Sequence, residues 1–492
     1  MNELRSLLYA PAAARAIDAR AIRQLGIAGS TLMERAGMAA YRFLRRRWPA
    51  AQRLAVLCGA GNNGGDGYVL ARLALDDGLQ VTLLQLGDHG RLRGEALDAA
   101  NAYRQAGGTV RPFQAGEPLD ADVLVDAIVG TGLDRPLAGN WAAAVEALND
   151  SGRPVLALDT PSGLHGGSGA VLGCAVAATA TITFIAHKSG LFTGSGPALV
   201  GELELAGLGV PEAAFEGSEA TARLIDRQRV AAMLPRRPRD AHKGRYGHVL
   251  VIGGDHGMGG AVRMAGEAAA RVGAGLVTVA TRPAHCAGLL AARPELMCHG
   301  VDGADELQPL LARASVVVLG PGLGRGAWSQ ALLQQALRFD GPLVIDADGL
   351  NLLAEAPQRS DRWVLTPHPG EAGRLLGVDT PAIQQDRYAA ARRLSERYGG
   401  VAVLKGAGTV VHAPGALPAV NTTGNPGMAS GGMGDVLSGV IGGLLAQGLA
   451  AADAATIGVW VHGAAADRAA ADGERGLLAL DLMRYLRELA NP

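Results

Sequence analysis

Short apolar, β-branched runs alternate along the chain with stretches of helical periodicity, and glycines stand at nearly every strand end. Such alternation is typical of a parallel β-sheet with helices on both faces, so we predict an α/β protein. The strands predicted in the first half are Leu54–Cys58, Val81–Gln85, Val123–Ile128, Val155–Leu158 and Thr181–Ile185. Those predicted in the second half are His248–Ile252, Leu276–Ala280, Val316–Leu319, Leu343–Ile345, Trp363–Thr366 and Val401–Leu404.

A polar, proline-containing stretch over residues 210–242 separates the two sets of strands. A chain of 492 residues is too long for one ordinary core. We therefore predict two domains, 1–220 and 221–492. We interpret the basic residues in this stretch as a solvated connector rather than as a binding patch.

Composition removes several classes of function. The 45 basic and 46 acidic residues give no electrostatic reason to expect nucleic acid or an anionic membrane surface as a partner. No apolar, uncharged run reaches the roughly 20 residues that a membrane span needs. The four cysteines show no metal-ligand spacing, and the N-terminus mixes acidic and basic residues, unlike a signal peptide. We expect a reduced, cytoplasmic protein.

The glycine-rich segment Asn425–Gly439 places a single carboxylate, Asp435, before a helical pattern. Glycines let the backbone approach a ligand, and a helix N-terminus favours phosphate. An aspartate there suggests a base that removes a proton from a hydroxyl as a phosphoryl group arrives. The alternative interpretation is an ordinary N-cap aspartate.

The loop Gly59–Gly67 follows a predicted strand and opens a helix, and its glycines fit the G-x-G-x-x-G spacing of dinucleotide-binding folds. An NAD-dependent dehydrogenase is therefore one alternative. Against it, the second strand ends in Leu86-Gly87 rather than in an acidic residue. Asn62, Asn63 and Asp66 add side-chain oxygens and donors, which implies a polar ligand, a cation or both.

Two more strand ends in the first half carry carboxylates. Asp126 and Asp159 stand where apolar strands end, and ligands of open α/β sheets bind beyond the carboxyl ends of strands. We expect Asp159 to do acid–base work and Asp126 to act as an oxygen ligand. Lys188 either holds a phosphate or is a solvated loop residue, and the sequence does not separate the two.

In the second half, predicted strands are followed by the segments GGDHGMGGA, GPGLG, DADGLN, TPHPGE and LKGAGT. Lys405 and Thr409 lie upstream of the Asp435 loop, at a distance that suits binding of a nucleotide phosphate. No P-loop motif is present. His368 between two prolines is interpreted as a ligand contact. Asp346 and Asp348 are either metal-linked or helix caps.

Together these motifs resemble a known pair of domains. GAGNNGGDG, VDAIVGTG and LDTPSG resemble the NAD(P)H-hydrate epimerase domain, which has a Rossmann-like, three-layer fold. HKGRYGHVLVIGG, GPGLG, TPHPGE, LKGAGT and NPGMASGGMGDVLSG resemble the ADP-dependent NAD(P)H-hydrate dehydratase domain, which has a ribokinase-like, three-layer fold. The chain is thus similar over nearly its whole length to bacterial repair enzymes that fuse both.

The resemblance implies site residues for each domain. In the first, Asp159 is the catalytic residue, and the hydrate is bound by Asn62, Asn63, Gly64, Gly65, Asp66, Gly130, Thr131, Gly132, Leu133, Asp134, Arg135, Pro136 and Asp159. A potassium ion is ligated there by Asn63, Asp126 and Ser162. In the second, Asp435 is the catalytic residue, and the hydrate is bound by Ala261, Gly324, His368 and Asp435. The adenine nucleotide is bound by Lys405, Gly406, Ala407, Gly408, Thr409 and Gly434.

The implied partners are NADH hydrate, NADPH hydrate and ADP, with a magnesium ion accompanying ADP and with no nucleic acid or membrane. A homo-oligomer of unspecified size is also expected. The resemblance leaves open the preference between the two hydrates, the strictness of ADP over ATP, and any channelling between sites. The competing interpretation is a vitamin-precursor kinase fused to a nucleotide-binding module, because the Asp435 loop suits any hydroxyl acceptor.

Overall fold

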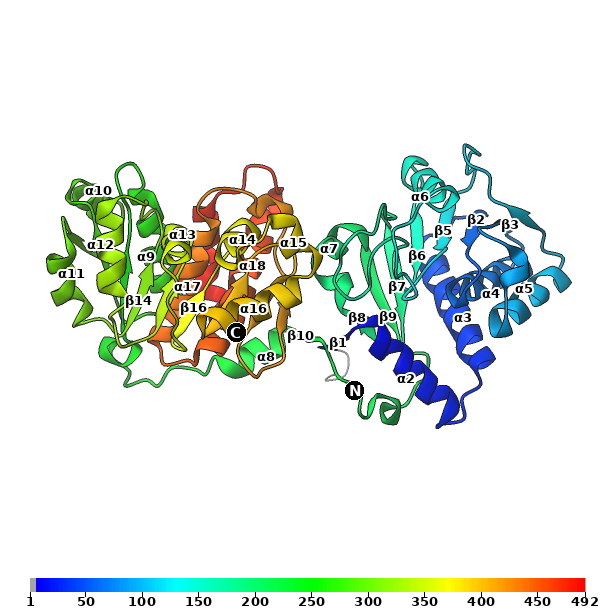
Figure 1. Cartoon of the computed structure of the whole chain (residues 1–492), viewed down its shortest axis with the longest axis horizontal. Helices are drawn as coiled ribbons and strands as arrows, with labels where there is room; N and C mark the ends of the chain where they lie inside the picture. Colours follow the sequence, from blue (N-terminus) through cyan, green and yellow to red (C-terminus); the bar gives the residue numbers. More distant parts are fainter. Residues whose placement is uncertain (1–5, 492) are drawn as a thin grey trace. The chain divides into compact units, whose positions relative to one another are not determined.

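The computed structural model describes residues 6–491, in a chain that divides into two compact units, Met1–Ala222 and Arg223–Pro492 (Figure 1). Within the described residues, no helix is both long enough and apolar enough to cross a bilayer.

Unit 1 is built on a seven-stranded sheet in the order β4-β3-β2-β5-β6-β7-β9, with every pairing parallel. Its strands are β2 (Arg53–Cys58), β3 (Gln80–Gln85), β4 (Val110–Pro112), β5 (Val123–Ala127), β6 (Val155–Leu158), β7 (Ala180–Phe184) and β9 (Glu202–Ala206). A further short parallel pair is β1 (Leu7–Tyr9) with β8 (His187–Lys188). Its helices are α2 (Pro11–Arg23), α3 (Gly29–Arg47), α4 (Asn62–Asp76), α5 (Gly94–Gln105), α6 (Asn140–Asp150) and α7 (Gly196–Leu199). Short 3₁₀ turns lie at His89–Arg91, Ser189–Phe192 and Glu212–Phe215.

Helices cover both faces of this sheet, as the apolar runs predict. Along β2, Leu54 and Val56 pack into a cluster with α3, α4 and α5, whereas Ala55 and Leu57 pack into another with α6. Successive side chains of a strand point to opposite faces. A strand apolar at every position is therefore buried on both sides, which leaves the strand ends as the place for polar chemistry.

Unit 2 contains the strand order β13-β12-β11-β14-β15-β16-β17-β18-β19-β10. The strands are β10 (Ala222–Leu224), β11 (His248–Ile252), β12 (Leu276–Thr281), β13 (Met297–Gly300), β14 (Val316–Leu319), β15 (Leu343–Ile345), β16 (Trp363–Leu365), β17 (Val401–Leu404), β18 (Thr409–His412) and β19 (Ala419–Asn421). The helices are α8 (Arg227–Met233), α9 (Gly259–Arg271), α10 (Cys286–Ala292), α11 (Ala304–Leu311), α12 (Ala327–Ala336), α13 (Ala347–Glu355), α14 (Pro369–Leu376), α15 (Thr380–Gln385), α16 (Arg387–Tyr398), α17 (Met433–Ala446), α18 (Ala451–Ala469) and α19 (Met483–Leu489). Further 3₁₀ turns lie at Lys243–Tyr246, Pro283–His285, Pro426–Met428, Ala470–Asp472 and Ala479–Leu482.

This second sheet is mixed, whereas the sequence predicted a parallel one. The pairs β17–β18 and β18–β19 are antiparallel. The reason is the length of the connection, because residues 405–408 alone join β17 to β18. A parallel crossover needs about a dozen residues, so the chain reverses instead.

The polar stretch interpreted as a connector is partly folded. It contains β10 and α8, whose N-cap Asp226 accepts a hydrogen bond from the Arg229 backbone. The guanidinium of Arg237 donates to Gln447 Oε1 at 2.6 Å and stacks 3.6 Å from the centre of the Tyr246 ring. At least one residue of the basic cluster is therefore tied to the surface of unit 2 rather than free in solvent.

Close helix packing fixes α17 against α9. A Cβ on Gly439 would lie 2.0 Å from the Ala265 carbonyl oxygen of α9, and one on Gly443 would lie 2.6 Å from that of Ala269. Only glycine permits this approach, so the helix that carries Asp435 is fixed against α9.

Candidate active sites

A cavity of about 510 Å³ opens in unit 1 beyond the carboxyl ends of β2, β5, β6 and β7. Its walls come from loops that are far apart in the sequence, as expected for an open α/β sheet. Of the residues implied as ligands, the lining includes Asn62, Asn63, Asp66, Gly130, Thr131, Gly132 and Asp159. Gly64, Gly65 and residues 133–136 lie outside this lining.

Gly64 and Gly65 instead allow close packing where α4 begins. A Cβ on Gly64 would lie 2.0 Å from the Gly59 carbonyl oxygen, and one on Gly65 would lie 2.6 Å from Met33 Sδ. Gly64 thus brings α4 against the end of β2, and Gly65 brings it against α3. They set the position of the loop even though they do not line the cavity.

Asp159 lies in the cavity wall with a backbone φ of +63°, a left-handed conformation that is rare outside glycine. Its Oδ1 accepts a hydrogen bond from Lys188 Nζ at 2.5 Å, and its Oδ2 accepts one from the Thr131 backbone at 3.3 Å. Strained backbone held by such partners is typical of functional sites.

Lys188 is buried, with 3 % of its surface exposed, so the interpretation as a solvated lysine is wrong. Its ammonium also donates to the Phe184 carbonyl oxygen at 2.7 Å and to Thr183 Oγ1 at 3.1 Å. With Asp159 these partners occupy all three donors of the ammonium, and none is left for a phosphate.

Asp126 is fully buried at the end of β5. Its carboxylate accepts hydrogen bonds from Ser162 Oγ at 2.6 Å and from the Ser162 backbone at 2.8 Å. Burial nonetheless raises the pKa of Asp126 to about 6, because these hydrogen bonds only partly offset it. Nearby, both polar side-chain atoms of Asn63 are buried without a partner among the described residues.

The residue at the end of β3 argues against the alternative that unit 1 is an NAD-dependent dehydrogenase. A ribose-binding carboxylate would be expected there, but the position is taken by Gln85. Gln85 Oε1 accepts a hydrogen bond from the Tyr68 hydroxyl, and its Nε2 donates to the Leu86 carbonyl oxygen at 3.0 Å. The side chain is buried and fully engaged, so it is not available to a ribose.

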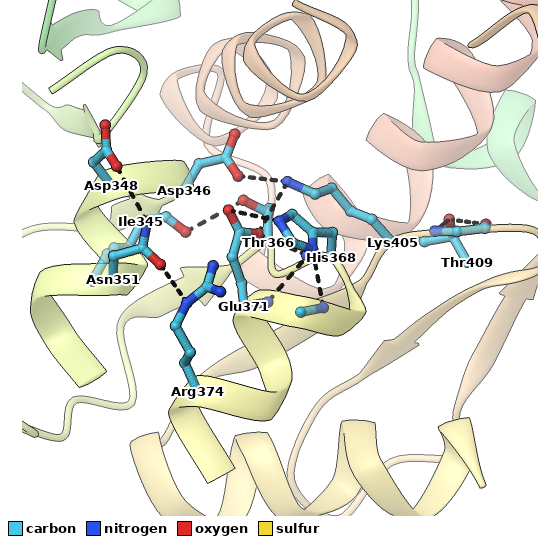
Figure 2. A network of polar contacts seen from close by, with 12 residues as sticks. Ile345, Asp346, Asp348, Asn351, Thr366, His368, Glu371, Arg374, Lys405 and Thr409 are labelled. Carbon is cyan, nitrogen blue, oxygen red and sulfur yellow. Dashed lines mark hydrogen bonds and ion pairs between the residues drawn. The ribbon is translucent and has the colours of Figure 1, made fainter. Parts of the chain in front are cut away.

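In unit 2 the polar groups gather at the ends of β15, β16 and β17 (Figure 2). Lys405 Nζ lies 2.7 Å from Asp346 Oδ1 and 3.8 Å from Glu371 Oε2. Burial alone would lower the pKa of Lys405, but the two carboxylates outweigh burial and raise it. The Oδ2 atom of Asp346 is buried without a hydrogen-bond partner among the described residues.

Asp435 lies in the first turn of α17, and its side chain does not cap that helix. The N-cap is Gly432, whose φ of +92° is left-handed, and no side-chain capping bond is present there. A Cβ on Gly434 would lie 3.3 Å from Lys405 Nζ and 3.6 Å from Asp346 Oδ2, so this turn lies against the Lys405–Asp346 pair. Burial and the charge of Asp346 raise the pKa of Asp435 to about 7, with Lys405 opposing them.

His368 is the N-cap of α14 and half exposed. Its Nδ1 accepts a hydrogen bond from the Gly370 backbone at 3.0 Å, while Glu371 Oε2 accepts one from the His368 backbone at 2.8 Å. Burial, together with the charges of Lys405 and Arg374, lowers its pKa, so the ring is neutral near pH 7. The exposed part of the ring leaves room for a ligand contact beside the capping role.

Neither Asp346 nor Asp348 acts as a helix cap. Asp346 stands at the N-cap position of α13 without a capping bond, and the next residue, Ala347, has a left-handed φ of +47°. Asp348 Oδ2 accepts a hydrogen bond from the Gly324 backbone at 2.9 Å, which anchors the GPGLG loop. Ala261 borders the same loop, because a Cβ on Gly322 would lie 3.1 Å from Ala261 Cβ.

The loop over residues 405–409 is stabilised by hydrogen bonds within the loop and by others from a buried arginine. Thr409 Oγ1 donates to the Gly406 carbonyl oxygen at 2.9 Å and accepts from the Gly406 backbone at 3.3 Å. The guanidinium of Arg387, which is 1 % exposed, donates to the Leu404 and Lys405 carbonyl oxygens at 3.0 and 3.1 Å. The Thr409 hydroxyl therefore shapes the turn that presents Lys405.

Comparison with known proteins follows the same division of the chain. Residues 29–190 match a family described as YjeF-related protein N-terminus, and residues 249–488 match one described as NAD(P)H-hydrate dehydratase. A bifunctional NAD(P)H-hydrate repair enzyme of Coxiella burnetii is 53 % identical over 490 residues, which are 99 % of this chain and all of that one. The chain belongs to the family of bifunctional NAD(P)H-hydrate repair enzymes. The member from Escherichia coli is 48 % identical, over 95 % of this chain and 91 % of its own.

Solved structures match the dehydratase half of this repair enzyme. An ADP/ATP-dependent NAD(P)H-hydrate dehydratase from Bacillus subtilis, co-crystallised with ATP and Mg²⁺, is 30 % identical with a TM-score of 0.50. A ribokinase-like superfamily protein from Enterococcus faecalis is 31 % identical, also with a TM-score of 0.50. Each match covers 55 % of this chain and 97 % of the other. The C-terminal fold is therefore ribokinase-like.

Several residues of these sites escaped the sequence analysis. Glu371 and Arg387 support the Lys405 loop, and Asp18 lines the unit 1 cavity from α2. Glu371 stood in the quoted TPHPGE motif and could have been found there as the capping-box partner of His368. Asp18 and Arg387 lie in ordinary amphipathic helix patterns, which carry no signal of their role.

Proposed function

We propose that unit 1 interconverts the R and S forms of NADH and NADPH hydrated at C6, and that unit 2 dehydrates the S form. In the second reaction ADP is converted to AMP and phosphate. The observation that carries this proposal is the place of Asp435, in the first turn of α17 beside the partly buried Lys405, where burial and the charge of Asp346 raise its pKa to about 7. A general base works best when its pKa lies near the working pH.

The dehydratase must first turn hydroxide into a better leaving group. Asp435 takes the proton of the C6 hydroxyl, whose oxygen then attacks the terminal phosphorus of ADP and releases AMP. Backbone amides of the turn over residues 431–434 face the transferred group and stabilise its charge. Neutral His368 and the loop around Gly324 hold the hydrate in place.

In the second step the lone pair of the ring nitrogen expels phosphate from C6. Loss of a proton from the neighbouring C5 then restores the dihydropyridine ring. Atoms balance over the two steps, because the oxygen of the C6 hydroxyl leaves in the released phosphate, while the hydroxyl hydrogen and one C5 hydrogen leave as protons. Only the S hydrate presents its hydroxyl to Asp435. An epimerase on the same chain is therefore useful, because it converts the R hydrate to the S form.

Lys405 and the turn through Thr409 are proposed to hold the nucleotide. The donor set also fits magnesium, because Asp346 offers a buried carboxylate oxygen without a partner, and Mg²⁺ prefers such oxygens. Asp346 would hold the ion, which neutralises phosphate charge when bound. Residues 405–409 and Gly434 would then contact the adenine nucleotide.

The unit 1 site fits potassium. Asn63 has a buried amide oxygen without a partner, and Asp126 is a buried carboxylate with no counter-ion among the described residues. Together with Ser162 these side chains supply oxygen atoms only, which suits a hard monovalent cation. A bound potassium ion would supply the positive charge that Asp126 lacks.

Asp159 is proposed as the acid–base residue of epimerisation. It lines the cavity, and its carboxylate accepts a hydrogen bond from the buried ammonium of Lys188. Asn62–Asp66 and Gly130–Pro136 would hold the hydrate around it. A kinase fused to a binding module remains the competing proposal, but it gives the 510 Å³ cavity and the strained Asp159 no task. The homo-oligomer expected for the chain stays a prediction.

Incubation of the purified chain with mixed hydrate epimers tests both assignments. With ADP present, the absorbance of reduced nicotinamide should recover fully, because R hydrate is converted to S hydrate and consumed. Without ADP it should stay flat while chiral separation of the hydrates shows exchange. Phosphorylation of an added alcohol, with no recovery of absorbance, would favour the kinase instead.

A further inference from the structure

Asp66 is a buried acid of the unit 1 cavity whose surroundings suit a proton donor. It lies in α4, 9 % exposed, and its side chain forms part of the cavity lining. Within residues 6–491 its carboxyl makes no hydrogen bond or ion pair. A buried carboxylate without such partners is costly, so the neutral, protonated form is favoured.

Asp159, on the same cavity, has the opposite environment. A buried ammonium lies 2.5 Å from its Oδ1, and the Thr131 backbone donates to its Oδ2. These contacts stabilise the ionised form. The cavity therefore presents one carboxylate and one carboxylic acid to the same ligand, and such a divided pair indicates a base and an acid.

The chemistry of the substrate calls for both. In the hydrate, C6 bears a hydroxyl and the ring nitrogen, so it is a carbinolamine carbon. Its configuration can invert if the bond from C6 to the ring nitrogen breaks, leaving an open-chain aldehyde that recloses on its other face. Opening requires removal of the hydroxyl proton and delivery of a proton to the departing nitrogen.

We propose that Asp66 is a catalytic residue of epimerisation that donates its proton to the ring nitrogen while Asp159 accepts the proton of the C6 hydroxyl. The O–H and C6–N bonds break, and the C6=O and N–H bonds form, with no change of oxidation state. After rotation about the C5–C6 bond, the nitrogen attacks the other face of the aldehyde and both protons return. This inference rests on the epimerase function proposed above.

The charges around Asp66 support its acid role. Burial raises the pKa of Asp66 well above its ordinary range, and the carboxylates of Asp159 and Asp18 raise it further, whereas Lys188 lowers it. Arg15 of α2 and Glu95 of α5 also line the cavity, and the buried thiol of Cys58 on β2 interacts with Asp66. Asp66 should therefore keep its proton to a higher pH than an ordinary aspartate does.

The test measures the pH dependence of epimerisation of pure R hydrate, with the enzyme-free rate subtracted. The wild-type rate should fall on the alkaline side as Asp66 ionises. Asp66→Asn keeps the shape of the side chain but cannot donate this proton, so kcat should fall by about 100-fold or more. Asp66→Glu should recover part of the rate and the alkaline fall.

Asp18→Asn is the matched control, since it removes another cavity carboxylate. It should keep the alkaline fall but move it to lower pH, because the charge of Asp18 helps to raise the pKa of Asp66. Thermal unfolding and dehydration of pure S hydrate by the same preparations check that both variants are folded.

The possible results distinguish a failure of the proposed epimerase function from a failure of the role proposed for Asp66. A wild-type chain that does not accelerate epimerisation would remove the proposed function itself. A wild type that epimerises without an alkaline fall would overturn the role of Asp66 alone. So would an Asp66→Asn variant that stays within about threefold of the wild-type rate or keeps the alkaline fall, since catalysis by a general acid contributes far more.

Discussion

The ammonium of Lys188 lies 2.5 Å from Oδ1 of Asp159, and both side chains are largely buried in unit 1. Buried ion pairs are expensive to break, because the remaining charge is left without a partner. The pair thus couples the proposed base to the stability of the unit.

Lys188→Met should therefore harm both stability and epimerisation. We expect a loss of about 3–5 kcal/mol in the free energy of unfolding of unit 1, measured by denaturant titration. Adding Asp159→Asn to this variant should restore most of the stability, because no buried charge is left alone, but none of the activity. If the double variant is no more stable than Lys188→Met, the two side chains are not energetically coupled.

Dehydration should depend on pH through Asp435. A base with a pKa of about 7 is ionised only above that value, so kcat for dehydration of S hydrate should rise as the pH rises through about 7. Asp435→Asn should reduce that kcat by about 100- to 10,000-fold while epimerisation persists. Asp159→Asn should show the reverse pattern. Loss of both activities in either variant would contradict independent sites.

The groups around Asp435 should shift this pH dependence in opposite directions. The charge of Asp346 raises the pKa of Asp435 and that of Lys405 lowers it. Asp346→Asn should therefore move the midpoint of the pH profile to lower pH, and Lys405→Met should move it to higher pH, both at saturating ADP. Midpoints that move together would show that the profile reports some other group.

Potassium should stabilise unit 1 through Asp126. Replacing KCl by tetramethylammonium chloride at equal ionic strength should lower the melting temperature at pH values above about 6, where this carboxyl is ionised. Below that pH the protonated carboxyl is a poor ligand and the difference should shrink. Asp126→Asn should abolish the dependence on potassium at every pH. A difference that survives in this variant would place the ion elsewhere.

The sequence predicted well what local patterns determine. Five strands, including Val155–Leu158 and His248–Ile252, have the predicted bounds, because each is a short apolar run flanked by turn residues. The polar side chains singled out in the sequence also lie at the carboxyl ends of strands, where open α/β sheets bind ligands. The antiparallel strand Thr409–His412 was not predicted, because a four-residue connection leaves little trace in hydrophobic periodicity.

What the sequence could not predict depends on distant contacts. Lys188 is 29 positions from Asp159, and nothing in the HKSG segment marks it as a buried counter-ion. Asp18 reaches the cavity from a helix near the start of the chain. The unpartnered oxygen of Asp346 is equally invisible, because satisfaction of a polar atom is a property of the packed structure.

The left-handed backbone of Asp159 limits which replacements can be interpreted at that position. Aspartate and asparagine tolerate this conformation better than other non-glycine residues, and alanine lacks the side chain that would help it to do so. An alanine scan would therefore mix a folding defect with a chemical one here. Abundance and turnover should therefore be measured separately for each replacement, because asparagine suits this backbone but leaves the buried charge of Lys188 without its partner.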